Sequence, residues 1–254
     1  MIEIYAHIHA ELRRDLALSE DTKPIFYTFR RCPYAMRARM ALVASQQQVE
    51  LREILLRDKP AAMLAASQKA TVPVLVIDTE DVLEESLDIM LWSLKRNDPQ
   101  NWLSSQQGSL DDMLKLIEEM DGDFKHHLDS YKYASRHASE AEDQAVFAKQ
   151  HRTAAITILA KLDATLSKQN FLFGSRIALA DIAIAPFVRQ FANTDINWFN
   201  SQPLPHLQAW LRQFLATPLF ASIMSKYKPW APGADTPPFP PVLAQDSAST
   251  IPPG

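Results

Sequence analysis

The spacing of apolar and polar residues divides the chain into two regions, and the first alternates short apolar runs with helical patterns. The runs "IFYTF", "VELREILL" and "VPVLVID", which begin at residues 25, 49 and 72, predict three strands, and "TEDVLEE" predicts a fourth. Helices are expected from Pro33 to about Gln46, from Pro60 to Ser67, and from Ser86 onward. This order predicts an α/β domain over residues 25–97, with the first two strands parallel and the last two in a hairpin.

The second region has helical spacing throughout. After a linker at residues 98–108, a long amphipathic helix is predicted from Asp111 to about Ala134, and its apolar stripe comprises Leu114, Ile117, Met120, Phe124, Leu128 and Tyr131. A second helix is expected from about Ser139 to Leu166, and the stretches "ALADIAIAPFVRQFA" and "LPHLQAWLRQFLATPLFASIM" predict several more. Residues 109–228 are therefore expected to form an all-α domain.

The two ends of the chain differ from the regions between them. Residues 1–24 are interpreted as an N-terminal arm, with a short helix around Ala10 to Leu18. Nearly half of the 17 prolines follow Lys228, so residues 229–254 are expected to run extended over the surface or to be disordered.

Composition limits the function classes. A net charge of −4 argues against a protein that binds nucleic acid or a membrane surface, and no apolar run reaches the ~18 residues that span a bilayer. The first residues show no apolar stretch typical of a signal peptide, and the single cysteine gives no intrachain disulfide. A cytoplasmic location is expected.

That single cysteine, Cys32, stands immediately before a proline at the start of a predicted helix. Unpaired backbone N–H groups and the helix dipole favour a thiolate there, and Arg30 and Arg31 add positive potential. Cys32 is therefore a candidate redox nucleophile. The alternative is an inert core cysteine, which is common among free cysteines.

Two further segments suit a peptide ligand. If the bond between Val72 and Pro73 is cis, the backbone of Val72 is free to pair with an extended peptide; a trans proline at a strand start is the alternative. Ser86 is expected to cap a helix whose N-terminus could bind a carboxylate, and Glu85 could pair with an ammonium. Capping alone also explains Ser86.

The combination of a strand, a helix beginning "CPYA", the segment "VPVL" and "ES" at a later helix start resembles the glutathione S-transferase superfamily. Within it the chain is most similar to the omega class and its bacterial omega-like relatives, which also carry a Lys-Pro pair some thirteen residues before the Val-Pro. The resemblance covers about residues 25–228. It implies a thioredoxin-like N-terminal domain followed by a helical-bundle domain, the glutathione transferase fold.

The resemblance also implies a role for each residue of the glutathione site. Cys32 would form a mixed disulfide with glutathione, and Lys59 would bind its glycine carboxylate. Val72, ahead of a cis Pro73, would pair with the cysteinyl backbone. Glu85 and Ser86 would hold the γ-glutamyl end, and Pro33 completes the predicted set. For the second substrate the candidates are Tyr34, Phe124 and Tyr131, although the helix bearing the last two could equally be an ordinary amphipathic helix.

The function predicted is a glutathione-dependent thiol transferase or reductase of omega-like type, for which dehydroascorbate is one possible substrate. Position 35 is alanine, so no C-x-x-C pair exists for a dithiol cycle. The alternatives are a glutathione-conjugating transferase, which acts on small electrophiles, and a noncatalytic interaction protein on the same fold. The partners expected are glutathione, a small disulfide or electrophilic substrate, and a second copy of the chain in a homodimer.

Two details complete the predictions. Asp181 matches the family's buried helix start, but Ala178 replaces the capping hydroxyl, a loss of roughly 1 kcal/mol. His126 and His127 are adjacent, and adjacent helical positions point about 100° apart. They are therefore not expected to chelate together, and no metal is predicted.

Overall fold

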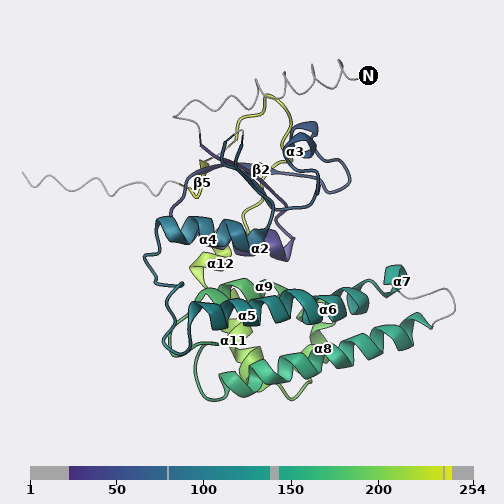
Figure 1. The fold of residues 1–254 in the computed structure, drawn as a ribbon. Coiled ribbons are helices and arrows are strands. Elements are labelled where there is room, and N and C mark those ends of the chain that lie inside the picture. The colour runs from purple at the N-terminus through teal and green to yellow at the C-terminus, as the bar shows by residue number, and fades with distance from the viewer. Residues whose placement is uncertain (1–22, 79, 138–142, 237, 242–254) are drawn as a thin grey trace, which may run out of the picture.

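The computed structural model describes residues 23–78, 80–137, 143–236 and 238–241 (Figure 1). The predicted arm helix, the start of the helix expected from Ser139 and the last thirteen residues of the tail lie outside the described residues. Within the described ranges the chain forms a sheet domain followed by a helical domain, as the sequence predicts.

The sheet has five strands in the order β4-β3-β1-β2-β5. They are β1 (Ile25–Thr28), β2 (Val49–Glu53), β3 (Val74–Val76), β4 (Val82–Leu83) and β5 (Pro238–Phe239). The predicted parallel pairing of β1 with β2 and the predicted β3–β4 hairpin are both confirmed. β1 also pairs antiparallel with β3, so the sheet is mixed.

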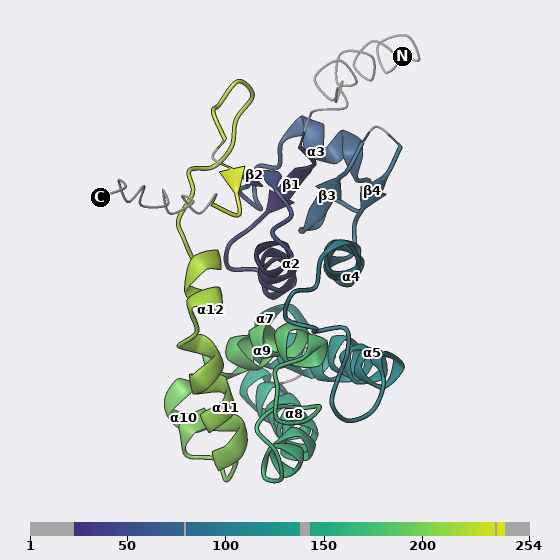
Figure 2. The same ribbon diagram turned by 90° about the vertical axis from the view of Figure 1, so that its left-hand side faces the viewer.

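Helices cover both faces of the sheet (Figure 2). Helices α2 (Pro33–Ala44) and α4 (Ser86–Arg96) pack together on the face toward the second domain, and α3 (Ala61–Ala66) lies on the opposite face. Alternate strand residues serve the two faces: Phe26 and Leu75 belong to the large core, while Tyr27 and Val74 belong to a smaller cluster with Met63 of α3. Burial on both faces explains why these strands read as continuous apolar runs.

The second domain is all-helical in its described residues. Its helices are α5 (Leu110–Glu119), the π-helical turn η1 (Met120–Phe124), α6 (Lys125–Lys132), α7 (Ala134–His137), α8 (Gln144–Leu166), α9 (Leu179–Ala192), α10 (Ile196–Asn200), α11 (Pro205–Leu215) and α12 (Pro218–Ile223). One hydrophobic core runs from the sheet through α2 and α9 into this bundle, and the linker contributes Trp102, which is fully buried. None of the described helices is long and apolar enough to cross a membrane.

The long helix predicted from Asp111 to about Ala134 is interrupted by η1. A π turn inserts one extra residue into the helical register, and such turns are frequent at functional sites. Here it contains Asp121, which pairs with Arg37 of α2 across the domain boundary.

Most of the described tail residues are exposed, in keeping with the prediction of an extended surface segment, but β5 departs from it by joining the sheet. β5 pairs with the free edge of β2, Phe239 is 0 % exposed, and the backbone N–H of Trp230 donates to the carbonyl of Glu53 at 2.7 Å. A proline-rich segment can do this because an edge strand tolerates residues that lack an N–H donor. The sequence pattern did not show it because only Phe239 and Pro240 are buried among the described tail residues.

Candidate functional site

A cleft of about 580 Å³ opens between the sheet domain and the π turn of the helical domain. Its walls come from five separate segments: the start of α2, the loop before α3, the loop before β3, the start of α4, and η1. The lining residues are Cys32, Tyr34, Leu56, Lys59, Lys69, Ala70, Thr71, Val72, Pro73, Glu84, Glu85, Ser86 and Asp121. Six of the residues predicted from the sequence for catalysis or glutathione binding therefore line one cavity: Cys32, Lys59, Val72, Pro73, Glu85 and Ser86.

Cys32 is the N-cap residue of α2, as its position before Pro33 predicts. Its Sγ lies 3.6 Å from the carbonyl oxygen of Val72, so the thiol is oriented across the cleft toward the segment before β3. The Val72–Pro73 peptide bond is cis, as the resemblance implies. The Val72 carbonyl is thus engaged by the thiol.

The prediction that Cys32 ionises easily is contradicted. Burial raises the pKa of the thiol, and this outweighs the lowering by the backbone N–H groups of Ala35 and Tyr34 and by two cations. Those cations are Lys125 and Arg37 rather than Arg30 and Arg31. The sequence shows the helix start but does not show how much water the folded chain excludes from it.

Ser86 does not cap α4. It is the first helical residue, and Glu85 occupies the N-cap position without a side-chain capping bond. The Ser86 hydroxyl is buried and accepts a hydrogen bond from Arg37 Nε at 2.9 Å. Since Arg37 binds this hydroxyl directly, Ser86 is held by tertiary contact rather than by its own helix.

Arg37 and Asp121 were not predicted as site residues. The Arg37 guanidinium, 2 % exposed, donates two parallel hydrogen bonds to Asp121, at 2.9 and 2.6 Å. It thereby joins α2 to α4 and η1 through the lining residues Ser86 and Asp121. The two residues are 84 positions apart, and nothing local in the sequence links them.

Glu85 and Lys59, which are expected to bind the two ends of glutathione, differ in their surroundings. Glu85 forms an ion pair with Lys69, which the sequence did not suggest. Lys59 is half-buried, and the described part of the chain gives it no ion pair. A ligand ammonium would therefore compete with Lys69 for Glu85, whereas Lys59 is ready to accept a carboxylate.

Among the second-substrate candidates, only Tyr34 lines the cleft. Its ring packs edge-on against Phe187, and burial with the nearby Asp121 carboxylate raises the pKa of its hydroxyl to about 12.

Phe124 is fully buried and packs against Phe191, as does the half-buried ring of Tyr131. Neither residue lines this cleft, and their stripe packs against the core, as the alternative of an ordinary amphipathic helix expects. Pro33 is buried at the first position of α2 and is not a lining residue.

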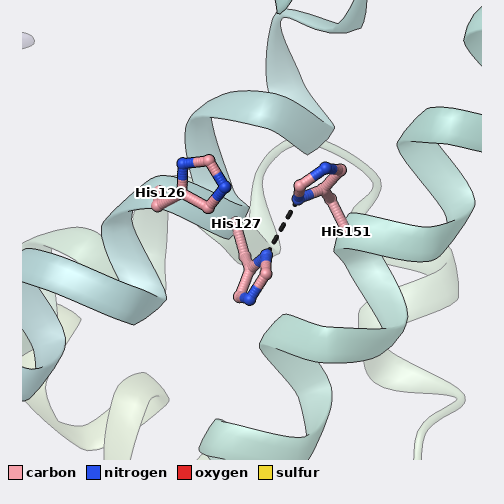
Figure 3. Close-up of side chains that lie close together, drawn as sticks. All are labelled: His126, His127 and His151. Carbon is pink, nitrogen blue, oxygen red and sulfur yellow. Dashed lines mark hydrogen bonds between the residues drawn. The ribbon is translucent and has the colours of Figure 1, made fainter. Parts of the chain in front are cut away.

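The offset of about 100° between adjacent helical positions does not keep the ligand atoms of the paired histidines apart. The ligand atoms of His126, His127 and His151 all lie within 4.8 Å of one another (Figure 3). Adjacent residues of one helix can converge when their rings turn toward a third side chain on a neighbouring helix. The sequence pattern alone did not place α8 beside α6.

Comparison with known proteins agrees with this architecture. Residues 26–102 match the family model of the glutathione S-transferase N-terminal domain, and residues 140–213 match that of the C-terminal domain. Together the two matches cover more than half of the chain. The protein belongs to the glutathione S-transferase superfamily, and it has that superfamily's fold, a thioredoxin-like sheet domain followed by a helical domain.

Individual relatives are similar over different extents. Glutathione S-transferase GstB of Escherichia coli K12 is 34 % identical over 67 residues, which are 26 % of this chain and 31 % of that protein. This alignment therefore spans about a third of the curated relative. A glutathione transferase family member from Pseudomonas fluorescens, solved with two glutathione molecules bound, superimposes with a TM-score of 0.68 at 16 % identity, over 84 % of this chain and 97 % of that one.

A second solved structure is a glutathione transferase from Phanerochaete chrysosporium in complex with oxidised glutathione. It superimposes with a TM-score of 0.68 at 18 % identity, over 81 % of this chain and 96 % of that one. At such identities the similarity concerns the fold. The assignment of residues to substrate and chemistry depends on the cleft itself.

Proposed function

We propose that the protein is a glutathione-dependent thiol transferase of omega-like type, which acts through a mixed disulfide between Cys32 and glutathione. The observation that carries this proposal is the position of the only thiol in the chain, at a helix N-terminus in the cleft. The same cleft contains the predicted carboxylate-binding Lys59 and ammonium-binding Glu85.

Glutathione is proposed to lie along the segment before β3. Lys59 binds the glycine carboxylate, the Val72 backbone beside Pro73 pairs with the cysteinyl residue, and Glu85 with Ser86 holds the γ-glutamyl end. This orientation brings the ligand sulfur toward Cys32, whose Sγ already contacts the Val72 carbonyl. Arg37 keeps Ser86 in position, and its bond to Asp121 keeps the helical wall of the cleft in place.

The reaction is a pair of thiol–disulfide exchanges. The Cys32 thiolate attacks the glutathione sulfur of a glutathionylated substrate, a Cys32–glutathione disulfide forms, and the substrate leaves as a thiolate that takes up a proton. A second glutathione, as thiolate, attacks the glutathione sulfur of that disulfide. Oxidised glutathione leaves and the Cys32 thiolate is restored. The net reaction consumes one free glutathione, because the other half of the oxidised glutathione comes from the substrate disulfide. Reduction of dehydroascorbate at the expense of glutathione is a proposed alternative use of the same thiol.

The cleft also contains a feature that favours a second candidate, glutathione conjugation to a small electrophile. With a pKa of about 12 the Tyr34 hydroxyl is protonated at neutral pH, so it can donate a hydrogen bond to a glutathione thiolate. The raised pKa of Cys32 weakens the case for its own attack, which makes this candidate a serious competitor. A noncatalytic interaction protein would need neither residue.

The variant Cys32→Ser distinguishes these functions. After incubation with oxidised glutathione, intact mass should show one glutathione on the wild-type chain, removable by a reductant, and none on Cys32→Ser. Thiol transfer by the variant should fall to background while glutathione binding stays within about ten-fold. Tyr34→Phe is the matched control, which should retain thiol transfer. Full thiol transfer by Cys32→Ser would refute the proposal, and conjugation lost only in Tyr34→Phe would favour the second candidate.

The protein is also proposed to act as a homodimer, the commonest closed assembly. Each domain has a large apolar side chain exposed to solvent: Leu64 of α3 is 45 % exposed, and Val146 of α8 is 53 % exposed. These positions suit a two-fold pairing of the sheet domain of one subunit with the long helices of the other.

A further inference from the structure

Three histidines gather outside the cleft, between two helices that are far apart in sequence. His126 and His127 belong to α6, and His151 belongs to α8, 24 residues after His127 (Figure 3). The ring centroids of the three pairs are 5.0, 5.2 and 5.3 Å apart. We infer that these three imidazoles form a binding site for one divalent transition-metal ion of the zinc type.

The geometry arises from the packing of α6 along α8. The Cβ atoms of adjacent helical residues diverge by about 100°, so His126 and His127 lie on either side of the line that faces α8. Both rings can turn toward that line, where His151 meets them. Each residue offers one ligand nitrogen, and these three nitrogens lie within 4.8 Å of one another.

Two of the three ligand nitrogens are close to the separation that a metal ion requires, and the third, on the exposed His126, lies within 4.8 Å of them and has to rotate inward. Zinc binds histidine nitrogen at about 2.0–2.1 Å in a tetrahedral arrangement, which holds two nitrogens about 3.4 Å apart. His127 Nδ1 and His151 Nδ1 are 2.8 Å apart and share one hydrogen bond. A metal ion replaces that shared proton if the two nitrogens separate by about half an ångström, an adjustment that small side-chain rotations supply.

The donor set selects the class of ion. Three imidazole nitrogens suit zinc, copper or nickel, whereas magnesium and calcium require oxygen ligands. Metal binding needs the neutral form of each imidazole, so the affinity should fall as the pH is lowered. The Asp123 carboxylate interacts electrostatically with His127, and its negative charge favours a cation in the cluster.

The fourth coordination position faces solvent. His126 is exposed, while His127 and His151 are half-buried, so the cluster lies at the surface of the groove between the helices. A water molecule therefore completes the tetrahedron, and the ion can enter from solution without opening the fold. A bound ion joins α6 to α8 and stabilises the helical domain by mass action.

The test is a calorimetric titration of the full-length chain with zinc chloride. The protein is first treated with a chelator to remove any bound metal. The Cys32→Ser background removes the only thiol, so that histidine binding is measured alone. We expect one ion per chain. His126→Gln is the first variant because this side chain is exposed and its loss should not disturb the fold. It should weaken zinc binding by more than about ten-fold, since even outer partners of metal ligands are worth 10- to 100-fold.

His206→Gln is the matched control, because His206 is also an exposed histidine on a helix and lies outside the cluster. It should bind zinc as the parent does. His127→Gln removes a second proposed ligand. Thermal melting of each chelator-treated variant without metal shows whether its fold is intact. Zinc should raise the melting temperature of the parent and of His206→Gln, but not that of His127→Gln.

Unchanged zinc affinity in folded His126→Gln and His127→Gln would overturn the inference, as would an equal loss in His206→Gln. Neither measurement involves glutathione. The metal site and the proposed glutathione chemistry can therefore fail independently of each other.

Discussion

The chemistry of Cys32 depends on opposing influences that act on one atom. Removal of water raises the pKa of the thiol, while two backbone N–H groups, Lys125 and Arg37 lower it by a smaller amount. In the unliganded protein the thiol is therefore the main form at neutral pH. A substrate that displaces the Val72 carbonyl from the thiol, or that adds a positive charge nearby, would change this balance.

The first prediction tests the direction of this shift. Iodoacetamide reacts with thiolates, so the alkylation rate of Cys32 should keep rising above about pH 8.5, the ordinary cysteine value. Removal of a nearby cation in Lys125→Met should move the midpoint still higher. Lys161→Met removes a lysine that pairs with Glu119 on the surface, and it should change nothing. A midpoint well below 8.5 in the wild type would show that the helix N-terminus outweighs burial.

A second residue-scale prediction concerns Glu85 and its ion pair with Lys69. Glu85→Gln removes the charge proposed to bind the ligand ammonium and should weaken glutathione binding by about three- to ten-fold, a moderate effect because the site is exposed to solvent. Lys69→Met removes the competitor, so affinity should stay the same or rise. Calorimetry with glutathione measures both. Equal losses in the two variants would mean that the ion pair shapes the cleft and that Glu85 does not contact the ligand.

At the scale of single elements, helix α9 shows how a missing cap is replaced. Ala178 occupies the N-cap position and has no hydroxyl, as the sequence indicates. Asp181 accepts hydrogen bonds from the backbone N–H groups of Ala178 and Leu172 and from the Trp210 indole, at 2.9 to 3.0 Å. Burial nevertheless raises the pKa of Asp181 to about 6, so this carboxylate supports the helix start at some electrostatic cost.

Restoring the cap should stabilise the helix. In Ala178→Ser the new hydroxyl can accept a hydrogen bond from the backbone N–H of Asp181, and the free energy of unfolding should rise by about 1 kcal/mol. Chemical denaturation measures the change. The control is Ala183→Ser, a buried position inside the same helix, where an added hydroxyl has no capping role and should destabilise. If both serines destabilise alike, the N-cap of α9 is already fully satisfied by Asp181.

At the scale of the whole molecule, local sequence signals predicted the local structure. The parallel β1–β2 pair, the β3–β4 hairpin and the position of Cys32 before α2 all follow from short runs and single prolines. Contacts between distant segments were missed, since periodicity carries no information about them. Examples are Arg37 with Asp121, His151 with the paired histidines, and β5 against β2.

Assembly is the next prediction at this scale. Light scattering at micromolar concentration should give twice the chain mass of 28.7 kDa if the proposed homodimer forms. Leu64→Glu places a charge on the exposed apolar side chain of α3 and should shift the equilibrium toward the monomer. A wild-type protein that scatters only as a 28.7 kDa species would contradict the dimer.

After the helical domain the chain returns to the sheet domain and packs against it. After α12 the chain crosses back, the Trp230 ring lies over the Arg52 guanidinium at 4.1 Å, and Phe239 is buried where β5 covers the edge of β2. Phe239→Ala should therefore cost about 3–5 kcal/mol of unfolding free energy, because it empties a filled apolar site.

Ile196→Ala is the matched comparison, since this apolar side chain is 46 % exposed and its truncation should change stability much less. β5 contributes no residue to the cleft, so glutathione binding by folded Phe239→Ala should match that of the wild type. If urea denaturation gave the same midpoint for Phe239→Ala and the wild type, the contact of β5 with the sheet would contribute little to stability. A lowered midpoint with retained binding would instead show that the C-terminal tail stabilises the sheet domain through a strand that takes no part in its chemistry.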